Sequence, residues 1–246
     1  MYQILRDIRR EREEQKEETN MEIKGQRRFP LLCTLRLQID WLYLHQFQLL
    51  YSVFSASNKF ISVSQPHQES RYHDWMKNEE LQKLTASEPL TLEEEFSMRD
   101  SWELDEDKCT FIILDKVTLN ETGDEVSAMI GDTNLFMLPD EDSLNTAEAE
   151  IMIAEMSARR KRRGWEAMLL MLRYGCQQLG IEKYCAKIGF DNKKSLSMFT
   201  KMGFHEVSRS NVFREVTLEK VVTPGWREWL EEETKDCTYL MYCSSQ

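Results

Sequence analysis

The sequence has few groups that bind zinc, and they are not arranged for it. Its 246 residues include six cysteines and four histidines. No C-x-x-C pair occurs, and no cluster of Cys and His has the spacing of a zinc site, so we expect no metal. Scattered thiols in a chain without a convincing secretory signal are typical of reduced intracellular proteins.

No hydrophobic run is long enough to cross a membrane. The best candidate, from Trp41 to Ala56, has no formal charge, but it is shorter than the ~20 residues that a spanning helix needs. It is also interrupted by His45, Gln46 and Gln48. A basic flank at its N-terminal side resembles a signal anchor, but the polar interruptions argue against one. We therefore expect no membrane partner.

Positive charge is also scarce. The formal net charge is -11 and the pI is near 5.0. This balance argues against a general nucleic-acid coat or an anionic membrane surface, and it is compatible with basic or amine-bearing substrates. Hydrophobic residues make up 41% and aromatic residues 10% of the chain, which is enough to fill a core. The length suits one domain with appendages, or at most two small domains.

The chain changes character along its length. Residues 6–19 are almost entirely charged or polar, which is typical of a solvated helix or a mobile segment. Residues 29–57 are apolar and aromatic and can form either a short helix or two strands. Regular patterns begin near residue 71 and end near Pro224. We therefore divide the chain into a divergent N-terminal extension (1–57), a domain (58–222) and a C-terminal tail (223–246).

The patterns in the domain and tail mix helices and strands. The expected helices cover residues 71–84, 91–102, 164–179, 193–202 and 226–233. The expected strands cover residues 110–114, 128–138, 147–154, 183–188 and 212–218, with a turn at 121–124. Gly180 and Gly203 stand where helices end, and Thr91 with Glu94 forms a capping box. Two helices before the first strands indicate an α+β fold rather than strict alternation.

A strand, a basic loop and a helix follow one another at residues 147–179. The loop contains Arg159, Arg160, Lys161, Arg162 and Arg163, followed by Gly164. The first N–H groups of a helix lack partners, and the helix dipole adds about half a positive charge there. Basic residues at this end oppose the dipole unless an anion is bound, which favours a phosphate ligand. A solvated basic run or a nuclear-localisation-like patch is the alternative.

Two segments resemble the GNAT N-acetyltransferases. The loop is similar to the GNAT pattern Gln/Arg-x-x-Gly-x-Gly/Ala, with Arg159 first, Gly164 last and Arg162 in place of the middle glycine. Further on, residues 192–204 read Asn-Lys-Lys-Ser-Leu-Ser-Met-Phe-Thr-Lys-Met-Gly-Phe, which resembles the GNAT segment lining the CoA arm. The resemblance implies a GNAT fold, with a central mixed, mostly antiparallel sheet flanked by helices, and it implies acetyl-CoA as cosubstrate.

The resemblance also implies which residues bind acetyl-CoA. The loop residues 159–164 would bind its diphosphate, and Asn192 and Phe199 would line its arm. The end of the third strand, at Ile153 and Ala154, would offer N–H donors near the thioester. Asn192 can instead cap the helix that follows it.

Three further runs, at residues 71–77, 84–91 and 150–155, resemble the N-acetyltransferase 9 family, and the likeness covers about residues 68–222. It implies a cytosolic protein N-acetyltransferase. The substrates proposed for that family are the N-termini of α- and β-tubulin, with a link to microtubules.

Acetyl transfer needs a neutral amine. An α-amine has a pKa of about 7.7–8.0 and lysine about 10.4, so an α-amine needs little help near neutral pH. Strand alternation places Glu148, Glu150 and Met152 on one face, and Glu150 is our candidate base, directly or through water. The alternative is an ordinary strand carboxylate. Many GNAT enzymes have a tyrosine where Phe199 stands, and since a phenyl ring cannot donate a proton, the acid is unassigned.

Two departures from the family bear on activity. Arg160 and Arg162 replace glycines, and a Cβ costs roughly 1 kcal/mol or more where φ must be positive; their guanidiniums can instead pair with phosphate. Residues 1 to about 65 do not match the family's start, although residues 60–63 can replace its edge strand. Two functions compete: an active N-acetyltransferase, and a catalytically impaired GNAT-fold binding module associated with microtubules.

Overall fold

One large sheet organises the molecule. The computed structural model describes residues 49–54, 58–62, 69–85, 87–89, 91, 94, 107–139 and 144–243. Nine strands form a sheet in the order β7-β8-β6-β5-β4-β3-β2-β1-β9. They are β1 (Leu49–Phe54), β2 (Asn58–Ser62), β3 (Lys108–Asp115), β4 (Met129–Met137), β5 (Thr146–Ile153), β6 (Lys183–Gly189), β7 (His205–Ser210), β8 (Glu215–Val221) and β9 (Thr238–Cys243). Of the neighbouring pairs, β5 and β6 run parallel and the others antiparallel, which confirms the mixed, mostly antiparallel sheet.

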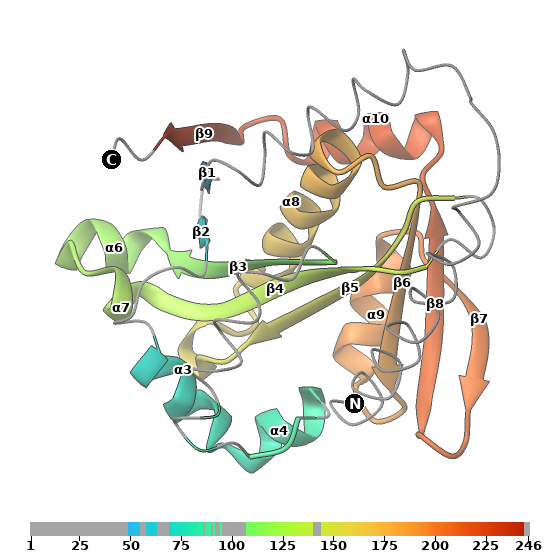
Figure 1. Cartoon of the computed structure of the whole chain (residues 1–246), viewed down its shortest axis with the longest axis horizontal. Coiled ribbons are helices and arrows are strands. Elements are labelled where there is room, and N and C mark those ends of the chain that lie inside the picture. Colours follow the sequence, from blue (N-terminus) through green and yellow to red (C-terminus); the bar gives the residue numbers. More distant parts are fainter. Residues whose placement is uncertain are drawn as a thin grey trace, which may run out of the picture.

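Helices cover both faces of this sheet. As drawn in Figure 1, α8 (Arg163–Gln178) and α10 (Pro224–Glu233) lie above the sheet, whereas α3 (Glu69–Met76) and α4 (Glu79–Thr85) lie below it. The remaining helices of the described residues are α6 (Lys116–Thr122), α7 (Glu125–Ala128), the 3-10 turn η3 (Met156–Ala158) and α9 (Lys193–Lys201). Helices that flank a mixed sheet make this an α+β fold, as expected.

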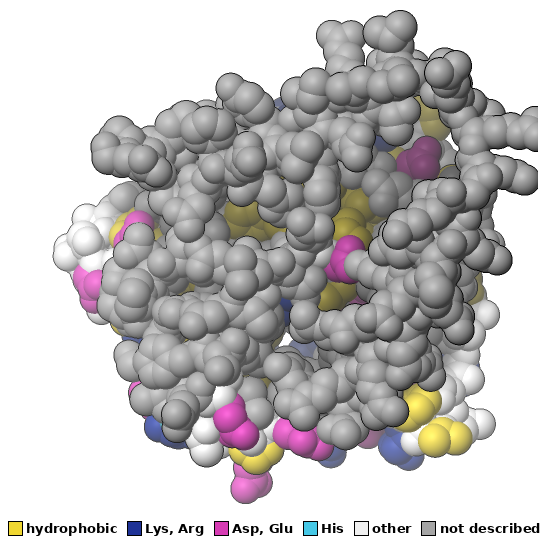
Figure 2. Space-filling model, viewed as in Figure 1, with side chains coloured by type: hydrophobic (Ala, Val, Ile, Leu, Met, Phe, Trp, Pro, Cys, Tyr) yellow, Lys and Arg dark blue, Asp and Glu magenta, His cyan; other side chains and the backbone are white. Residues whose placement is uncertain are grey.

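The sheet separates two apolar clusters. The larger one joins the buried side of α8, including Met168 and Leu172, to inward-facing strand residues such as Ile113, Leu135 and Tyr184. Each fully buried aliphatic side chain contributes about 1.5–3 kcal/mol, so α8 is the main element that holds this face together. In the space-filling view, described hydrophobic side chains are visible near the centre and at the lower right edge, and charged side chains are spread over several parts of the surface (Figure 2).

The smaller cluster lies on the opposite face and fixes α3 and α4. It joins Trp75 and Leu81 to Ile112, Met129 and Met152. Met152 therefore points toward α3 and α4, while its strand neighbours Ala147 and Ala149, in the larger cluster, point toward α8. This alternation decides which face carries the other side chains of β4 and β5.

Capping residues stand at the helix starts and ends that the sequence indicates. The side chain of Asn192 accepts a hydrogen bond of 3.1 Å from the N–H of Ser195 at the start of α9. Gly180 and Gly203 have φ values of 65° and 89°, which suit glycine better than other residues. The capping box is confirmed, since the N–H of Glu94 donates to Thr91 Oγ1 and the N–H of Thr91 donates to Glu94 Oε2. Most of the helix expected after Thr91 lies outside the described residues.

The helix expected at residues 71–84 is wrong as a single element. The chain makes two short helices, α3 and α4, with a break at Lys77 and Asn78. The side chain of Asn78 accepts hydrogen bonds from the N–H groups of Glu80 and Leu81, so it caps α4. Asn is a favoured N-cap residue because its side chain accepts hydrogen bonds from such N–H groups. The apolar periodicity continues across Asn78, so it gave no sign that a new helix begins there.

The turn expected at residues 121–124 belongs to a larger helical connection. Helix α6 begins after Asp115, whose side chain accepts from the N–H of Thr118, and it ends at Gly123 with φ 67°. Helix α7 begins after Asp124, whose side chain accepts from the N–H groups of Val126 and Ser127. Two aspartate caps and one left-handed glycine thus build both helices, which the sequence analysis missed.

The last strand expected, at residues 212–218, is also wrong in its bounds. A hairpin of β7 and β8 occupies this part of the chain. Strand β7 was missed because its residues are polar and mostly exposed, as is common for a strand at the edge of a sheet.

The two ends of the chain contribute to the same sheet. Strand β2 pairs with β3, as expected for residues 60–63, and β1 pairs with both β2 and β9. Residues 1–48 lie outside the described residues, so the charged segment 6–19 stays a prediction. The division at residues 57 and 222 also stays a prediction, although β1 and β9 lie beyond those limits.

The tail helix α10 is docked on the domain. Trp226 is buried, and its Nε1 donates to the carbonyl of Met202 at 2.8 Å. Arg173 of α8 donates to the carbonyl of Thr234 at 2.7 Å. In the described part of the chain, no helix is both long and apolar enough to cross a membrane.

Candidate functional site

Strands β5 and β6, at the centre of the sheet, are paired over only part of their length. Their parallel pairing covers Thr146 to Glu148 only. Beyond that point β5 stays paired with β4, as far as Ile153 opposite Gly131, and β6 stays paired with β8, as far as Gly189 opposite Glu215. The two strands diverge visibly in Figure 1. Among the described strands, none pairs with this edge of β5 beyond Glu148. We call this split in the backbone pairing the opening between β5 and β6.

The basic loop lies at the far end of β5 and keeps the backbone shape of a glycine loop. Arg160 and Arg162 have φ values of 62° and 61°, in the left-handed region that ordinary residues occupy at a cost. Arg162 is also the residue that precedes the first turn of α8. The loop therefore holds two arginines in a backbone conformation that glycine occupies without this cost.

Gly164 permits close packing of α8 against the end of β5. A Cβ there would lie 3.2 Å from Cγ1 of Ile153, which is tight enough to require a shift. The N-terminus of α8 therefore begins next to the point where β5 ends, at the mouth of the opening. A helix N-terminus with its unpaired N–H groups and positive dipole end is an anion site.

Two of the loop arginines hold the loop in place. Arg159 Nε donates to the carbonyl of Ile153 at 2.8 Å, and its Nη1 lies 3.6 Å from Glu80 of α4. Arg163 Nη2 lies 2.7 Å from Asp115 Oδ2, and both side chains are largely buried. The pKa of Asp115 is lowered, since the hydrogen bond from Thr118 and the charge of Arg163 outweigh the effect of burial.

The other basic side chains of the loop lie at the surface. Arg160, Lys161 and Arg162 are exposed, and the Arg162 guanidinium lies 5.6 Å from the centre of the Trp165 ring. Exposed guanidinium and ammonium groups beside a helix N-terminus are suited to pairing with an anion. Direct ligand contacts by any of the five basic residues stay predictions.

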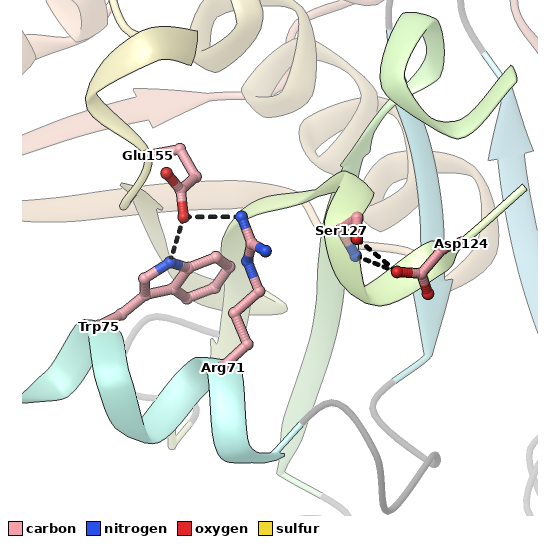
Figure 3. Close-up of polar contacts among 5 residues, drawn as sticks. All are labelled: Arg71, Trp75, Asp124, Ser127 and Glu155. Atoms are coloured by element: carbon pink, nitrogen blue, oxygen red, sulfur yellow. Dashed lines mark hydrogen bonds and ion pairs between the residues drawn. The ribbon is translucent and has the colours of Figure 1, made fainter. Parts of the chain in front are cut away.

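Glu155 ties the start of the loop to α3 (Figure 3). Its Oε1 accepts hydrogen bonds from Arg71 Nη2 at 2.9 Å and from Trp75 Nε1 at 2.8 Å. Its own N–H donates to the carbonyl of Ile130 on β4. The loop is therefore held from both sides, by the sheet and by the helices on the face opposite α8.

The structure gives different surroundings to the other predicted cofactor residues. The N–H of Ala154 donates to the carbonyl of Ile130 at 2.8 Å, so that group is already engaged. Asn192 caps α9, which confirms one of its two expected roles. Phe199 is buried, and its ring lies 5.0 Å from that of Phe204. Contacts of Ile153, Ala154, Asn192 and Phe199 with acetyl-CoA stay predictions.

A polar cluster surrounds Glu150 beside the opening. Glu150 lies opposite Asn134, and Asp132 lies opposite Met152. Cross-strand partners share a face, so these side chains lie on the face of the sheet that carries α3 and α4. Glu148 precedes Glu150 on the same face, and its Oε2 lies 2.8 Å from Lys187 Nζ on β6.

The surroundings of Glu150 bring its pKa close to neutrality. Burial, followed by the charge of Glu148, raises the pKa of Glu150 to about 7. Burial also raises the pKa of Asp132 to about 6, although a hydrogen bond from Asn134 opposes this. A carboxyl whose pKa lies close to the working pH is well suited to general base catalysis, and perturbed carboxyls gather at functional sites.

The sequence analysis identified Glu150 but missed Asp132, Asn134 and Lys187. A signal for the first two was present, because polar residues at alternate positions of an otherwise apolar strand must share a face. Lys187 had no such signal, since its contact with Glu148 depends on the parallel pairing of strands that are distant in sequence.

Comparison with known proteins identifies the family. The Acetyltransferase (GNAT) domain matches residues 63–205. The chain belongs to the GNAT acetyltransferase family. As a GNAT protein it is an acyltransferase, which agrees with the opening in the sheet and the anion loop.

Named relatives lie in the N-acetyltransferase 9 group. The chain is 51% identical over 176 residues to human alpha/beta-tubulin-N-acetyltransferase 9, covering 71% of this chain and 84% of the relative. It is 54% identical over 166 residues to the Drosophila melanogaster protein of the same name, covering 66% and 83%. A third relative is the N-acetyltransferase 9-like protein of Nematostella vectensis, which is 51% identical over 168 residues, covering 67% and 83%.

Solved structures share the fold. Spermidine N-acetyltransferase from Vibrio cholerae, solved with CoA and spermine, superposes with a TM-score of 0.57 at 14% identity, covering 71% of this chain and 99% of that one. A domain from Methanocaldococcus jannaschii has a TM-score of 0.55 at 22% identity, covering 68% and 99%. At these identities the likeness concerns the fold alone.

Proposed function

We propose that this GNAT protein transfers the acetyl group of acetyl-CoA to the α-amine at the N-terminus of a protein, with α- and β-tubulin as the first candidates. The observation that carries the proposal is a carboxyl with a pKa near 7, Glu150, beside the opening between β5 and β6. The tubulin candidates rest on the names of the human and Drosophila relatives.

The residues at the mouth of the opening fit acetyl-CoA. Its diphosphate needs N–H donors and positive charge, and the N-terminus of α8 with exposed Arg160, Lys161 and Arg162 supplies both. Arg160 and Arg162 hold the loop backbone in a left-handed conformation just before the first turn of α8. Acetyl-CoA supplies an acetyl group activated as a thioester.

The free-energy cost of passing a proton to Glu150 favours an α-amine over a lysine as the acceptor. An α-ammonium with a pKa of about 7.7–8.0 lies within roughly one unit of Glu150, so passing its proton to Glu150 costs about 1 kcal/mol. A lysine with a pKa of about 10.4 lies more than three units away, and the same transfer costs about 4.6 kcal/mol. Glu150 is therefore strong enough for an α-amine and weak for lysine.

A binding module without catalysis is the second candidate. The exposed basic side chains of Arg160, Lys161 and Arg162 favour it, because they also suit an acidic protein surface such as that of a microtubule. A pure binding module gives no reason for a carboxyl with a raised pKa inside the domain, next to the strand opening. We therefore place it second.

Peptide acetylation followed by mass spectrometry tests the proposal. One peptide has a free N-terminus and no lysine; its partner has the same sequence with a blocked N-terminus and one added lysine. Peptides with the N-terminal sequences of α- and β-tubulin form a third arm. We expect acetyl transfer to the free α-amines and little to the lysine.

Two variants sharpen this test. Glu150→Gln should lower kcat by roughly 10²- to 10⁴-fold, the usual contribution of a general base. Glu206→Gln on the exposed edge strand β7 removes a carboxylate far from the opening and should leave kcat unchanged. If Glu150→Gln transfers acetyl groups with an unchanged kcat, Glu150 is not the general base. Acetyl-CoA binding without transfer to any amine would favour the binding module.

A further inference from the structure

An ion pair bridges β5 and β6 at the point where their pairing ends. Glu148 lies opposite Cys185 in the last parallel pair of the two strands. Lys187, two residues further along β6, places its Nζ 2.8 Å from Glu148 Oε2. Between them Ala186 points into the cluster under α8, so Cys185 and Lys187 point to the other face. The ion pair therefore lies on the face of the sheet that carries α3, α4 and Glu150.

The contact with Lys187 holds the Glu148 carboxylate in one place. Glu148 is only 6% exposed, and its Oε2 accepts the hydrogen bond from Lys187 Nζ. Among the described residues, no group donates to its other oxygen, Oε1. Burial by itself would lower the pKa of Lys187, but the charge of Glu148 and the hydrogen bond to it raise that pKa above its ordinary value. Lys187 therefore stays a cation at neutral pH.

Glu150 is close enough to be influenced by both charges. Glu148 and Glu150 are two residues apart on one face of one strand, which separates their Cα atoms by about 6.6–6.8 Å. Charges interact strongly over such a distance where little water lies between them. The negative charge of Glu148 opposes ionisation of Glu150, whereas the positive charge of Lys187 favours it, and the effect of Glu148 is the larger. The two partners of one ion pair thus act on Glu150 in opposite directions.

Other titratable groups lie on this face and form a constant background. Asp132 on β4 opposes ionisation of Glu150, and Lys108 on β3 favours it. Cys185 stays a neutral thiol, since burial and the charge of Glu148 raise its pKa to about 12. The remaining titratable side chains are those of the two helices, Arg71, Tyr72, His73, Asp74, Glu79, Glu80 and Lys83, and those of β8 beyond β6, Glu215 and Glu219.

We infer that Glu148 and Lys187 are positioning residues for the base: their ion pair holds two opposite charges at fixed places beside Glu150 and so sets the pH at which this carboxyl accepts a proton. The inference rests on the proposed function and deepens it. An ion pair that only joins β5 to β6 would be broken alike by the loss of either partner. Opposite charges that act on Glu150 predict opposite effects instead.

A carboxyl titration by NMR tests the inference without relying on catalysis. The protein is labelled with ¹³C at the glutamate carboxyl carbons, and the signal of Glu150 is the one missing in Glu150→Gln. Glu148→Gln should lower the pKa of Glu150 by roughly 0.5–1.5 pH units, because it removes the negative charge and leaves Lys187 unopposed. Lys187→Met should raise that pKa by a smaller amount, since Lys187 has the smaller effect on Glu150.

A double variant and a matched ion pair serve as controls. Glu148→Gln combined with Lys187→Met should give Glu150 a pKa between those of the two single variants. If Lys187→Met alone does not fold, the double variant compared with Glu148→Gln reports the effect of the lysine. Glu232→Gln and Lys235→Met break an exposed ion pair of the same residue types, 2.7 Å long, at the end of α10, and should leave the pKa of Glu150 unchanged.

The pH profile of kcat separates this inference from the proposed function. Its acid limb should move to lower pH in Glu148→Gln and to higher pH in Lys187→Met. If the pKa of Glu150 moves in these opposite directions but acetyl transfer is absent or its acid limb does not follow, Glu150 is not the base and the inference stands. If transfer proceeds while both single variants move the pKa of Glu150 in the same direction, or leave it unchanged, the inference is overturned and the function stands.

Discussion

Replacing Arg160 with glycine should stabilise the protein even though it removes a side chain. Arg160 has φ 62°, where a residue with a Cβ costs roughly 1–2 kcal/mol. Glycine removes that cost, but it adds roughly 0.5–1 kcal/mol because the unfolded chain becomes more flexible. The difference is a net gain of about 0.5–1 kcal/mol, or roughly 1–4 °C in Tm for a chain of this size.

Lys161→Gly is the matched control for this change. Lys161 is the next residue, is also exposed and carries the same charge, but its φ is not positive. It should lose about 0.5–1 kcal/mol to the same entropy effect with no relief of strain. The two variants remove equal charge from the loop, so charge repulsion cannot separate them, and their difference should be about 1–2 kcal/mol.

Urea unfolding followed by fluorescence, with thermal unfolding in parallel, measures the difference. Arg160→Gly should shift the midpoint upward and Lys161→Gly downward, with equal slopes. Equal shifts for both variants would refute the reasoning, because they would mean that the left-handed conformation of Arg160 carries no cost in the folded protein.

Three further perturbations follow from the structure. Glu155→Gln should weaken acetyl-CoA binding several-fold in calorimetry, because the loop loses its charge-assisted anchor to Arg71 on α3. The free energy of unfolding of the wild type should fall between about pH 4 and 7, and Asp132→Asn and Glu150→Gln should each make this fall smaller. The folded protein retains protons on these raised-pKa groups that the unfolded chain has released, so stability falls as pH rises through that window. Trp226→Ala should cost about 3–5 kcal/mol in urea unfolding, as for other buried tryptophans.

Each of these has an outcome that contradicts it. The control for Glu155→Gln is Asp74→Asn on α3, which breaks an exposed ion pair with Lys77 just after that helix. Equal acetyl-CoA affinities in the two variants would show that the anchor does not shape the loop. A pH profile of stability that is the same in wild type and both amide variants would mean that the carboxyls are not buried as described. A loss below 1 kcal/mol for Trp226→Ala would mean that α10 is not docked on the domain.

Much of the domain could be predicted because its helices carry local signals. Apolar spacing with Gly180 at its end defines α8, and Asn192 with Gly203 defines α9. The short helices α6 and α7 could not be found in this way, because their aspartate caps resemble turn residues. Strand β7 escaped because an exposed edge strand does not need the apolar alternation that reveals a buried one.

The candidate site also contains features with a local sequence signal and features without one. The position of the basic loop between β5 and α8 could be predicted from the sequence, and its binding of an anion stays a prediction that rests on the conflict between a basic run and the helix dipole. Glu150 was predicted as the candidate base from strand alternation, and its role stays a prediction. Asp132 was missed although the alternating polar residues of β4 gave a signal for it. Lys187 was missed because its contact with Glu148 depends on the pairing of β5 with β6, which no local pattern reports.

The central claim is that the loop after β5 holds the diphosphate of acetyl-CoA beside the opening between β5 and β6. Calorimetry with two ligands tests it most directly: acetyl-CoA, and S-acetylpantetheine, which carries the same thioester arm without the diphosphate. The account predicts that acetyl-CoA binds at least roughly tenfold more tightly, as one or more charge-assisted hydrogen bonds would give. In the double variant Arg160→Gly with Arg162→Gly, the difference in affinity between the two ligands should become smaller but should not vanish, because the N–H groups of the loop remain. Equal affinities for the two ligands in the wild type would contradict the account.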